Sequence, residues 1–161
     1  LSANPSALFP GISTTINVNG ASGSYTWNYN GTTISNTSAS LPVNVDELGT
    51  YYVTVVDENG CSGTSASITI RDSVTSTLFI YPNPTNNGQF NVRYYSNSNQ
   101  GGRTINVFDS KGSRVYSNTF TIFGPYTNMP VNLSNLSKGV YTVELAERSG
   151  KRIKTGRVLV L

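Results

Sequence analysis

The segment Asp46-Glu47-Leu48-Gly49-Thr50-Tyr51-Tyr52-Val53-Thr54-Val55-Val56 decides the fold of the first half of this 161-residue chain. From Tyr51 onward it is dense in aromatic and β-branched residues, which favour a β-strand. Gly49 stands two residues before Tyr51, where the chain turns into that strand. We interpret the pattern as a corner, in which the Tyr51 ring packs inward and its hydroxyl bonds to nearby backbone.

The same pattern returns in the second half as Asn135-Leu136-Ser137-Lys138-Gly139-Val140-Tyr141-Thr142-Val143. Each copy has a leucine followed by Gly-x-Tyr-x-Val, and the two tyrosines are 90 residues apart. That separation is about the length of one small sandwich domain. The repeat therefore favours two tandem sandwiches over one long barrel.

Period-two alternation of polar and apolar residues predicts short strands along the whole chain. In the first half we expect strands at 15–19, 25–29, 41–45, 51–56 and 67–70. In the second half we expect them at 78–81, 90–94, 104–108, 114–116, 120–122, 129–133, 140–145 and 157–161. Pro42 cannot donate to a ladder, so the strand at 41–45 is expected at a sheet edge. The fold class is therefore all-β, with two tandem immunoglobulin-like β-sandwich domains.

The net charge changes sign between the two halves that carry the repeated pattern. Residues 1–73 hold one base against five acids, a net charge of −4, whereas residues 74–161 hold ten bases against three acids, a net charge of +7. Such a swing between halves indicates a domain boundary. Residues 73–77 are polar and weakly patterned, as a linker would be. We expect one domain at 1–72, this linker, and a second domain at 78–161.

The composition argues against catalysis. The chain has no His and one Cys, which excludes Ser-His-Asp triads, imidazole metal sites and an intramolecular disulfide. The sequence has no GxxxxGK[ST] or GxGxxG motif, so no phosphate-binding loop is indicated. We therefore expect no enzyme activity, no cofactor and no metal. No apolar run approaches about 18 residues, so no membrane-spanning helix is predicted.

The bases of the second half cluster only at 148–157, which resembles a hairpin tip flanked by strands. A solvated hairpin is the favoured interpretation, ahead of a docking patch for an acidic protein or an anionic glycan. Nucleic acid is not an expected partner, because no recognition helix or RNP-like motif accompanies the charge.

Tyr25, Trp27 and Tyr29 share one face of a predicted strand, which leaves two alternatives open. They could form a sugar-stacking face of an adhesive or binding module, or they could pack into the sandwich. We favour the core, because a tryptophan in this place of a sandwich is usually buried.

One stretch has no generic explanation: Tyr81-Pro82-Asn83-Pro84-Thr85-Asn86-Asn87-Gly88-Gln89-Phe90-Asn91-Val92. Pro82 and Pro84 restrict the backbone on both sides of Asn83, and Gly88 can supply a left-handed turn position. The stretch thus predicts a strand, a rigid corner, a loop and a second strand. It is followed by an Asp-x-x-Gly turn at 109–112, the Leu-Ser-x-Leu-x-x-Gly-x-Tyr block at 133–141 and an apolar terminal strand at 154–161.

This series of motifs resembles the type A C-terminal sorting domain of the bacterial type IX secretion system, over residues 78–161. The resemblance implies an immunoglobulin-like sandwich that acts as an address on a secreted cargo protein. It implies recognition elements at Pro82, Asn83, Pro84, Gly88, Phe90, Gly139, Tyr141, Lys154, Val158 and Val160.

The resemblance also implies partners and a route. The partners are a type IX translocon, an outer-membrane shuttle protein and a sortase-like cysteine peptidase, which joins the cargo to an anionic lipopolysaccharide. Cleavage is expected in the linker of Ser73, Val74, Thr75, Ser76 and Thr77. The chain would pass through the periplasm and then be secreted or attached to the cell surface.

Residues 49–61 resemble the end of immunoglobulin-like repeats in large surface proteins and adhesins of the same bacteria. The resemblance implies that the first domain is a spacer or an adhesive module. Because the chain begins at Leu1 without Met or a signal-peptide pattern, we expect it to be part of a longer protein.

Overall fold

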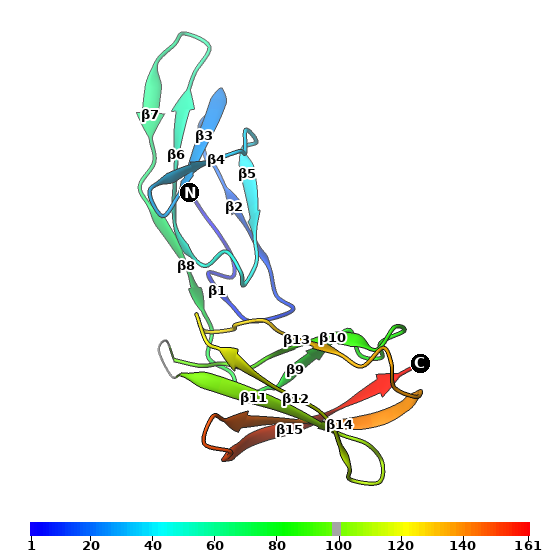
Figure 1. The fold of residues 1–161 in the computed structure, drawn as a ribbon. Coiled ribbons are helices and arrows are strands. Elements are labelled where there is room, and N and C mark those ends of the chain that lie inside the picture. The colour runs from blue at the N-terminus through cyan, green and yellow to red at the C-terminus, as the bar shows by residue number, and fades with distance from the viewer. Residues whose placement is uncertain (98–100) are drawn as a thin grey trace. The chain divides into compact units, whose positions relative to one another are not determined.

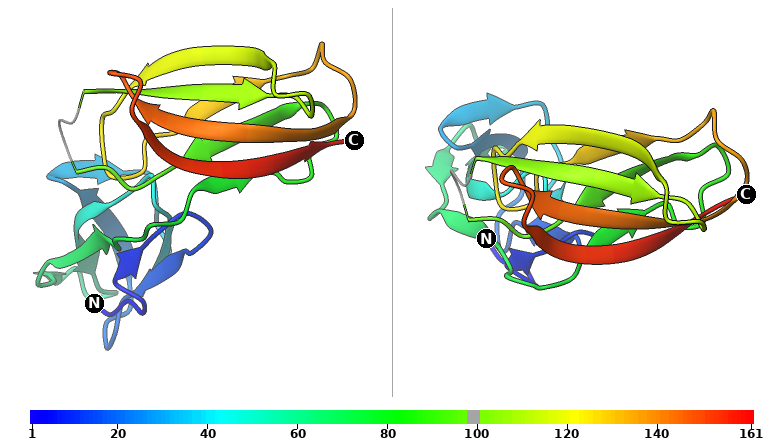
Figure 2. Two further views of the ribbon diagram at one scale, coloured as in Figure 1. Left: turned by 90° about the horizontal axis from the view of Figure 1, so that it is seen from below. Right: turned by 60° about the horizontal axis from the view of Figure 1, so that its bottom comes forward.

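The computed structural model describes residues 1–97 and 101–161, and these residues form strands, turns and loops without a helix. They divide into two compact units, Leu1–Val74 and Thr75–Leu161 (Figures 1 and 2). Each unit consists of two β-sheets that enclose a core of its own. The all-β, immunoglobulin-like sandwich class predicted from the sequence is confirmed.

The first unit packs a large sheet against a small one. The strands of the large sheet run in the order β1-β8-β6-β3-β4, with β7 also paired to β6, and the small sheet is β2-β5. Their bounds are β1 Ala7–Leu8, β2 Thr14–Asn17, β3 Ser24–Tyr29, β4 Thr32–Ile34, β5 Ser40–Val43, β6 Gly49–Val56, β7 Ser62–Thr64 and β8 Ile68–Asp72. Strand β5, which contains Pro42, pairs with β2 alone and is therefore an edge strand, as predicted.

The second unit packs a three-stranded sheet, β13-β10-β9, against a four-stranded sheet, β12-β11-β14-β15. The bounds are β9 Phe79–Tyr81, β10 Gln89–Arg93, β11 Gly102–Phe108, β12 Arg114–Thr121, β13 Met129–Asn132, β14 Gly139–Glu147 and β15 Arg152–Val160. All pairings between these named strands are antiparallel.

Side chains that alternate inward along these strands build the two cores. In the first unit Trp27, Tyr51 and Ile70 are almost fully buried, and the Trp27 indole donates to the Ser38 carbonyl oxygen over 2.8 Å. The aromatic strand thus faces the core, as favoured from the sequence. The core of the second unit consists of Phe90, Val92, Ile105, Val107, Ile122, Met129, Val131, Leu133, Tyr141, Val143, Leu145, Val158 and Val160.

Both predicted corners are present. The buried Tyr51 ring points into the first core, and its hydroxyl donates to the Glu47 carbonyl oxygen, four residues upstream. The Tyr141 hydroxyl donates to the Ser137 carbonyl oxygen with the same spacing. In each unit the corner therefore ties the start of a central strand to the loop that leads into it.

Three hairpin turns share one geometry. In each turn the carbonyl oxygen of the first residue accepts from the N–H of a glycine three positions later. The N–H of the same first residue donates to the carbonyl oxygen four positions later. The first residues are Asp57, Asp109 and Glu147. The two aspartates add a side-chain cap, because Oδ1 of each accepts from two main-chain N–H groups of its own turn. The Asp-x-x-Gly pattern is thus a structural turn signal in both units.

Two predicted strand boundaries in the second unit are wrong. The strands predicted at 114–116 and 120–122 form one continuous strand, β12, which pairs with β11 across the polar residues 117–119. The last strand, predicted at 157–161, already begins at Arg152. In both places polar residues continue the strand at the edge of a sheet. Their side chains remain exposed there, so the strand forms without the alternation of apolar and polar residues on which the prediction relied.

The corner tyrosine of the first unit has a shifted pKa. Burial raises the pKa of Tyr51 above its ordinary value of 10.0, and the nearby Tyr29 and Glu47 raise it further. Tyr29 stacks on Tyr51 with ring centroids 4.9 Å apart. The folded unit therefore holds the Tyr51 proton more tightly than the unfolded chain does.

We expect the first unit to lose stability as the pH rises above about 10, where an unfolded tyrosine ionises. Below that pH the contribution of Tyr51 is fully present, because the hydroxyl is protonated in both states. Denaturant unfolding followed by the fluorescence of Trp27, the single tryptophan, measures the loss between about pH 8 and about pH 11.

The Tyr51→Phe variant should lose about 1 kcal/mol at neutral pH through the missing hydrogen bond and show a smaller alkaline loss. Tyr52→Phe is the matched control, because Tyr52 lies on the opposite side of the same strand. An equal alkaline loss in wild type and Tyr51→Phe would contradict the assignment.

Candidate recognition site

The Pro-Asn-Pro-Thr segment closes the free edge of the last strand. We call residues 82–85, Pro82 to Thr85, the strap. Strand β15 pairs with β14 on one side and ends its sheet on the other, so its outer main-chain groups need other partners. The strap lies along that outer side, between Arg157 and Leu161.

Asn83 uses its side-chain amide in place of main chain. Its Nδ2 donates to the Arg157 carbonyl oxygen over 2.9 Å, and its Oδ1 accepts from the Leu159 N–H over 3.0 Å. Thr85 continues the contact with its backbone: its N–H donates to the Leu159 carbonyl oxygen, and its carbonyl oxygen accepts from the Leu161 N–H, both over 2.9 Å. Four outer-edge groups of residues 157–161 are thereby satisfied.

The loop after the strap is fixed by Thr85 and Gly88. Thr85 is fully buried, and its hydroxyl donates to the Gln89 carbonyl oxygen over 2.7 Å. Gly88 has a φ of +71°, and a Cβ there would lie 2.8 Å from backbone atoms of Leu133 and Ser134. Its carbonyl oxygen accepts from the Leu133 N–H. Only glycine fits this approach, so the loop is held against the Leu133 segment.

The residues predicted for recognition fall into two groups. Phe90, Tyr141, Val158 and Val160 are core residues with at most 7% of their surface exposed, and Gly88 is buried as well. Pro82, Asn83, Pro84 and Lys154 are exposed, and Gly139 is half-buried opposite Val160 in the ladder. The structure thus brings Asn83, Val158 and Val160 together at one sheet edge, where Asn83 is exposed and the two valines are buried.

Sequence reasoning did not identify Thr85, Arg157 and Leu159 as parts of the same site. Their signal is weak, because all three make the contact between strap and strand through backbone atoms, which carry no residue identity. The burial of Thr85 among exposed neighbours is visible only in the structure.

The predicted linker lies outside the strands. Strand β8 ends at Asp72 and β9 begins at Phe79, and Val74, Ser76 and Thr77 are exposed. Val74 exposes 72% of its surface although its side chain is apolar. Ser73 still donates its N–H to the Leu8 carbonyl oxygen, but from Val74 onward the segment is an exposed loop outside any ladder, the kind of site that proteases cut most readily.

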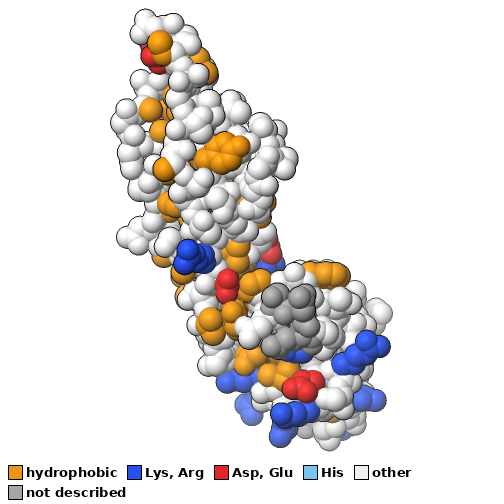
Figure 3. Space-filling view, turned by 90° about the vertical axis from the view of Figure 1, so that its left-hand side faces the viewer, with side chains coloured by type: hydrophobic (Ala, Val, Ile, Leu, Met, Phe, Trp, Pro, Cys, Tyr) orange, Lys and Arg blue, Asp and Glu red, His pale blue; other side chains and the backbone are white. Residues whose placement is uncertain are grey.

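The basic cluster belongs to the hairpin between β14 and β15. Arg148 and Lys151 lie at its turn, and Arg152, Lys154 and Arg157 lie on β15 itself; all five side chains are exposed. On the face drawn in Figure 3, Lys and Arg side chains gather over the second unit. The hairpin predicted at 148–157 is therefore present, with a longer strand on its C-terminal side.

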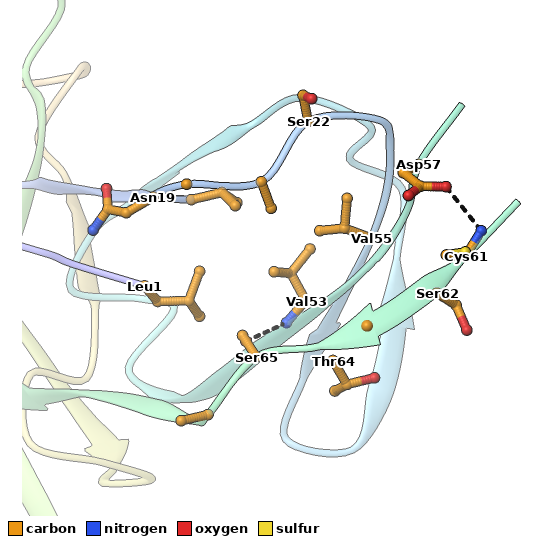
Figure 4. A pocket seen from close by; sticks show the side chains of 15 residues that line it. Leu1, Asn19, Ser22, Val53, Val55, Asp57, Cys61, Ser62, Thr64 and Ser65 are labelled. Carbon is orange, nitrogen blue, oxygen red and sulfur yellow. Dashed lines mark hydrogen bonds between the residues drawn. The ribbon is translucent and has the colours of Figure 1, made fainter. Parts of the chain in front are cut away.

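The first unit has an open pocket of about 680 Å³ between the 18–22 loop and the β6–β7 hairpin (Figure 4). Val53 and Val55 line it, and so does Cys61, whose thiol is free and exposed. Asp57 Oδ1 at its rim accepts from the Cys61 N–H, so this carboxylate serves its own turn. Among residues 1–97 and 101–161, no group of three or more His, Cys, Asp or Glu side chains could hold a metal ion.

No helix within the described ranges is long and apolar enough to cross a membrane.

Sandwich units with a tyrosine corner, and a strap that closes the last strand, define an all-β fold of the immunoglobulin-like class. Residues 79–159 match the family described as the secretion system C-terminal sorting domain. The chain belongs to this family, and the resemblance to the sorting domain of the type IX secretion system is confirmed. None of the curated proteins matches the chain.

Three solved structures show a distant likeness. PorZ, a surface component of the type IX secretion system of Porphyromonas gingivalis, is 16% identical over 68% of this chain and 15% of its own, with a TM-score of 0.38. The BSP domain of a biofilm-associated protein is 22% identical over 92% of this chain and 26% of its own, with a TM-score of 0.36. Fibronectin(III)-like modules of Clostridium thermocellum CbhA are 13% identical over 93% of this chain and 84% of theirs, with a TM-score of 0.30.

This chain therefore spans only a small part of the first two proteins. All three TM-scores lie below 0.5, so membership of the family rests on the sequence match.

We expect Asn83→Ala to open the outer edge of β15. The Leu159 amide loses its acceptor, so its hydrogen exchange should accelerate about tenfold, the factor that corresponds to about 1.4 kcal/mol. Hydrogen exchange resolved by NMR measures this amide. Asn86→Ala is the control, since Asn86 is exposed in the same loop. Unchanged exchange at Leu159 in Asn83→Ala would refute the strap contact.

Gly88→Ala should destabilise the second unit by more than about 1 kcal/mol, because the new Cβ meets backbone atoms that cannot move aside. Gly112→Ala is the matched control: its φ of +81° is similar, but nothing lies within 4 Å of the new Cβ. Thermal unfolding of the two variants gives the difference. Equal losses of stability in the two variants would show that the close approach of Gly88 to Leu133 does not contribute to the stability of the unit.

Proposed function

We propose that the second unit is a sorting signal that directs a cargo protein through the type IX secretion system to the cell surface or the medium. The observation that carries this proposal is the family match over residues 79–159. The mechanism is recognition of a folded surface, and the unit itself performs no reaction. The first unit acts as an immunoglobulin-like spacer.

The surface that a translocon or an outer-membrane shuttle protein would contact is the strap with the outer side of β15. Pro82, Asn83 and Pro84 are exposed there, and Lys154 and Arg157 add positive charge along the same strand. The buried members of the motif, such as Phe90 and Tyr141, support recognition indirectly by holding the sheets together. Positive charge on the β14–β15 hairpin would speed the encounter with an acidic partner.

After passage through the periplasm, a sortase-like cysteine peptidase would cleave within residues 73–77. The exposed main chain between β8 and β9 supports this position. Cleavage there leaves the strands of the second unit intact and separates them from the cargo side. The cargo would then be joined to an anionic lipopolysaccharide.

The rival function is an adhesive module that binds glycans through aromatic residues of the first unit. The burial of Trp27 weakens this alternative, because its ring is enclosed in the core and cannot stack on a sugar. No other observation in the first unit favours it.

Fusing residues 1–161 to a fluorescent protein that is exported to the periplasm of a bacterium with a type IX system tests the proposal. We expect fluorescence at the surface or in the medium, and mass spectrometry should show the second unit removed. Deleting residues 157–161 or substituting Pro82→Ala should reduce delivery, because both alter the strap and its strand.

Two controls separate recognition from stability. Asn86→Ala changes the same loop outside the strap and should be exported normally. Tyr51→Phe weakens the first unit alone and should also be exported. Delivery of a fusion that carries only residues 1–74, at the level of the complete chain, would refute the proposal.

A further inference from the structure

A second surface of the sorting unit has the features of a binding site. An open groove of about 560 Å³ is lined by Pro82, Asn87, Gln89, Phe90, Asn91, Tyr116, Pro130, Val131 and Asn132. Gln89 pairs with Asn132 and Asn91 with Pro130 in the β10–β13 ladder. These four residues alternate with the buried Phe90 and Val131, so they face outward. The groove therefore lies along the β10–β13 ladder of the three-stranded sheet, with Tyr116 contributed by β12 of the other sheet.

The lining carries no charge, although the unit as a whole is strongly basic. None of the nine residues is acidic or basic, whereas the second half of the chain has a net charge of +7. A charged ligand would find no counter-charge in the groove. Its ligand must therefore be recognised by hydrogen bonds and apolar contact.

Two amides in the groove have a fixed orientation. Asn87 Oδ1 accepts from the Gln89 N–H over 3.0 Å, and Asn132 Oδ1 accepts from the Ser134 N–H over 2.9 Å. A main-chain N–H can only donate, so each oxygen must face its own loop. Both Nδ2 groups are then left as donors, and neither makes a hydrogen bond with another described residue.

A third amide bonds to another side-chain amide, so no main-chain donor fixes its orientation. Asn91 Oδ1 accepts from the Asn128 amide over 2.9 Å, which leaves the Asn91 NH₂ group as a donor. Gln89, exposed between Asn87 and Asn91 in sequence, can both donate and accept. The groove thus presents oriented, uncharged donors beside one adaptable amide.

Apolar surfaces flank these donors. The Pro82 and Pro130 rings are exposed at the groove, and Tyr116 reaches across from the other sheet, with its hydroxyl 3.5 Å from the Pro130 carbonyl oxygen. Rings of this kind pack against the C–H faces of a sugar, while amides bond its hydroxyl or acetamido oxygens.

We propose that this groove binds an uncharged oligosaccharide. An extended peptide fits less well, because peptides dock on sheets by adding a main-chain ladder to a free edge. Strand β10 is paired on both sides, and the neighbouring edge strand β13 contains Pro130, which cannot donate to an added strand. Pro82 is shared with the strap, whereas the amide residues of the groove lie outside it, and the proposal does not depend on the sorting role.

The test uses variants that keep the acceptor and remove the donor. In Asn87→Asp with Asn132→Asp, the carboxylate oxygens still accept from Gln89 and Ser134, so the loops keep their hydrogen bonds. Asn118→Asp on β12 is the matched control, because its Oδ1 also accepts from a main-chain N–H and it lies outside the groove.

The isotope-labelled complete chain is titrated with chitotetraose, maltotetraose and cellotetraose, and with an uncharged tetra-alanine peptide, while NMR follows the amide signals. At least one sugar should shift the groove amides, and the double variant should bind it at least tenfold more weakly than Asn118→Asp. The proposal would be overturned if none of the sugars shifted the groove amide signals at concentrations up to about 10 mM, which is far above the dissociation constant of a specific site. Equal binding by the double variant, or binding of the peptide alone, would overturn it as well.

Discussion

The outer edge of β15 is the constraint on which the sorting unit depends. Between Arg157 and Leu161 four main-chain groups lack a partner strand, and unpaired groups at a sheet edge invite association with other chains. The strap satisfies them with one side-chain amide and one backbone residue. Because Thr85 is then buried and Gly88 touches the Leu133 segment, this single contact also fixes the loop that leads into β10.

The two units use the same local devices although their charges differ in sign. A corner tyrosine bonds to the carbonyl four residues upstream in each, at Tyr51 and at Tyr141, and an aspartate caps a hairpin turn in each, at Asp57 and at Asp109. These devices act over a few residues, so they serve any sandwich of this size. What distinguishes the second unit is the strap, in which a side-chain amide takes the place of main chain along β15, whereas the distant segments β1 and β8 of the first unit pair through their main chains.

That difference explains what could be predicted from the sequence. The corners, the longer strands and the burial of Trp27 follow from local patterns, because neighbouring residues decide them, whereas the short strands β1, β4 and β7 were not predicted. The pairing of Asn83 with Arg157 spans 74 residues and replaces main chain with a side chain, so no periodicity reveals it. The predicted recognition residues include both core residues such as Phe90 and exposed residues such as Pro82. The motif alone does not show which of its residues are needed for folding and which are available to a partner. Strand β12 was divided in two because residues 117–119 lack an apolar member.

The strap joins an early segment of the unit to its last residues, and this has a consequence for folding order. Residues 83–85 cannot complete their hydrogen bonds until residues 157–161 are available. A chain shortened by synthesis arrest or by proteolysis would display bare proline corners and an open ladder. The closed surface therefore forms only in a chain that has been extended through residue 161.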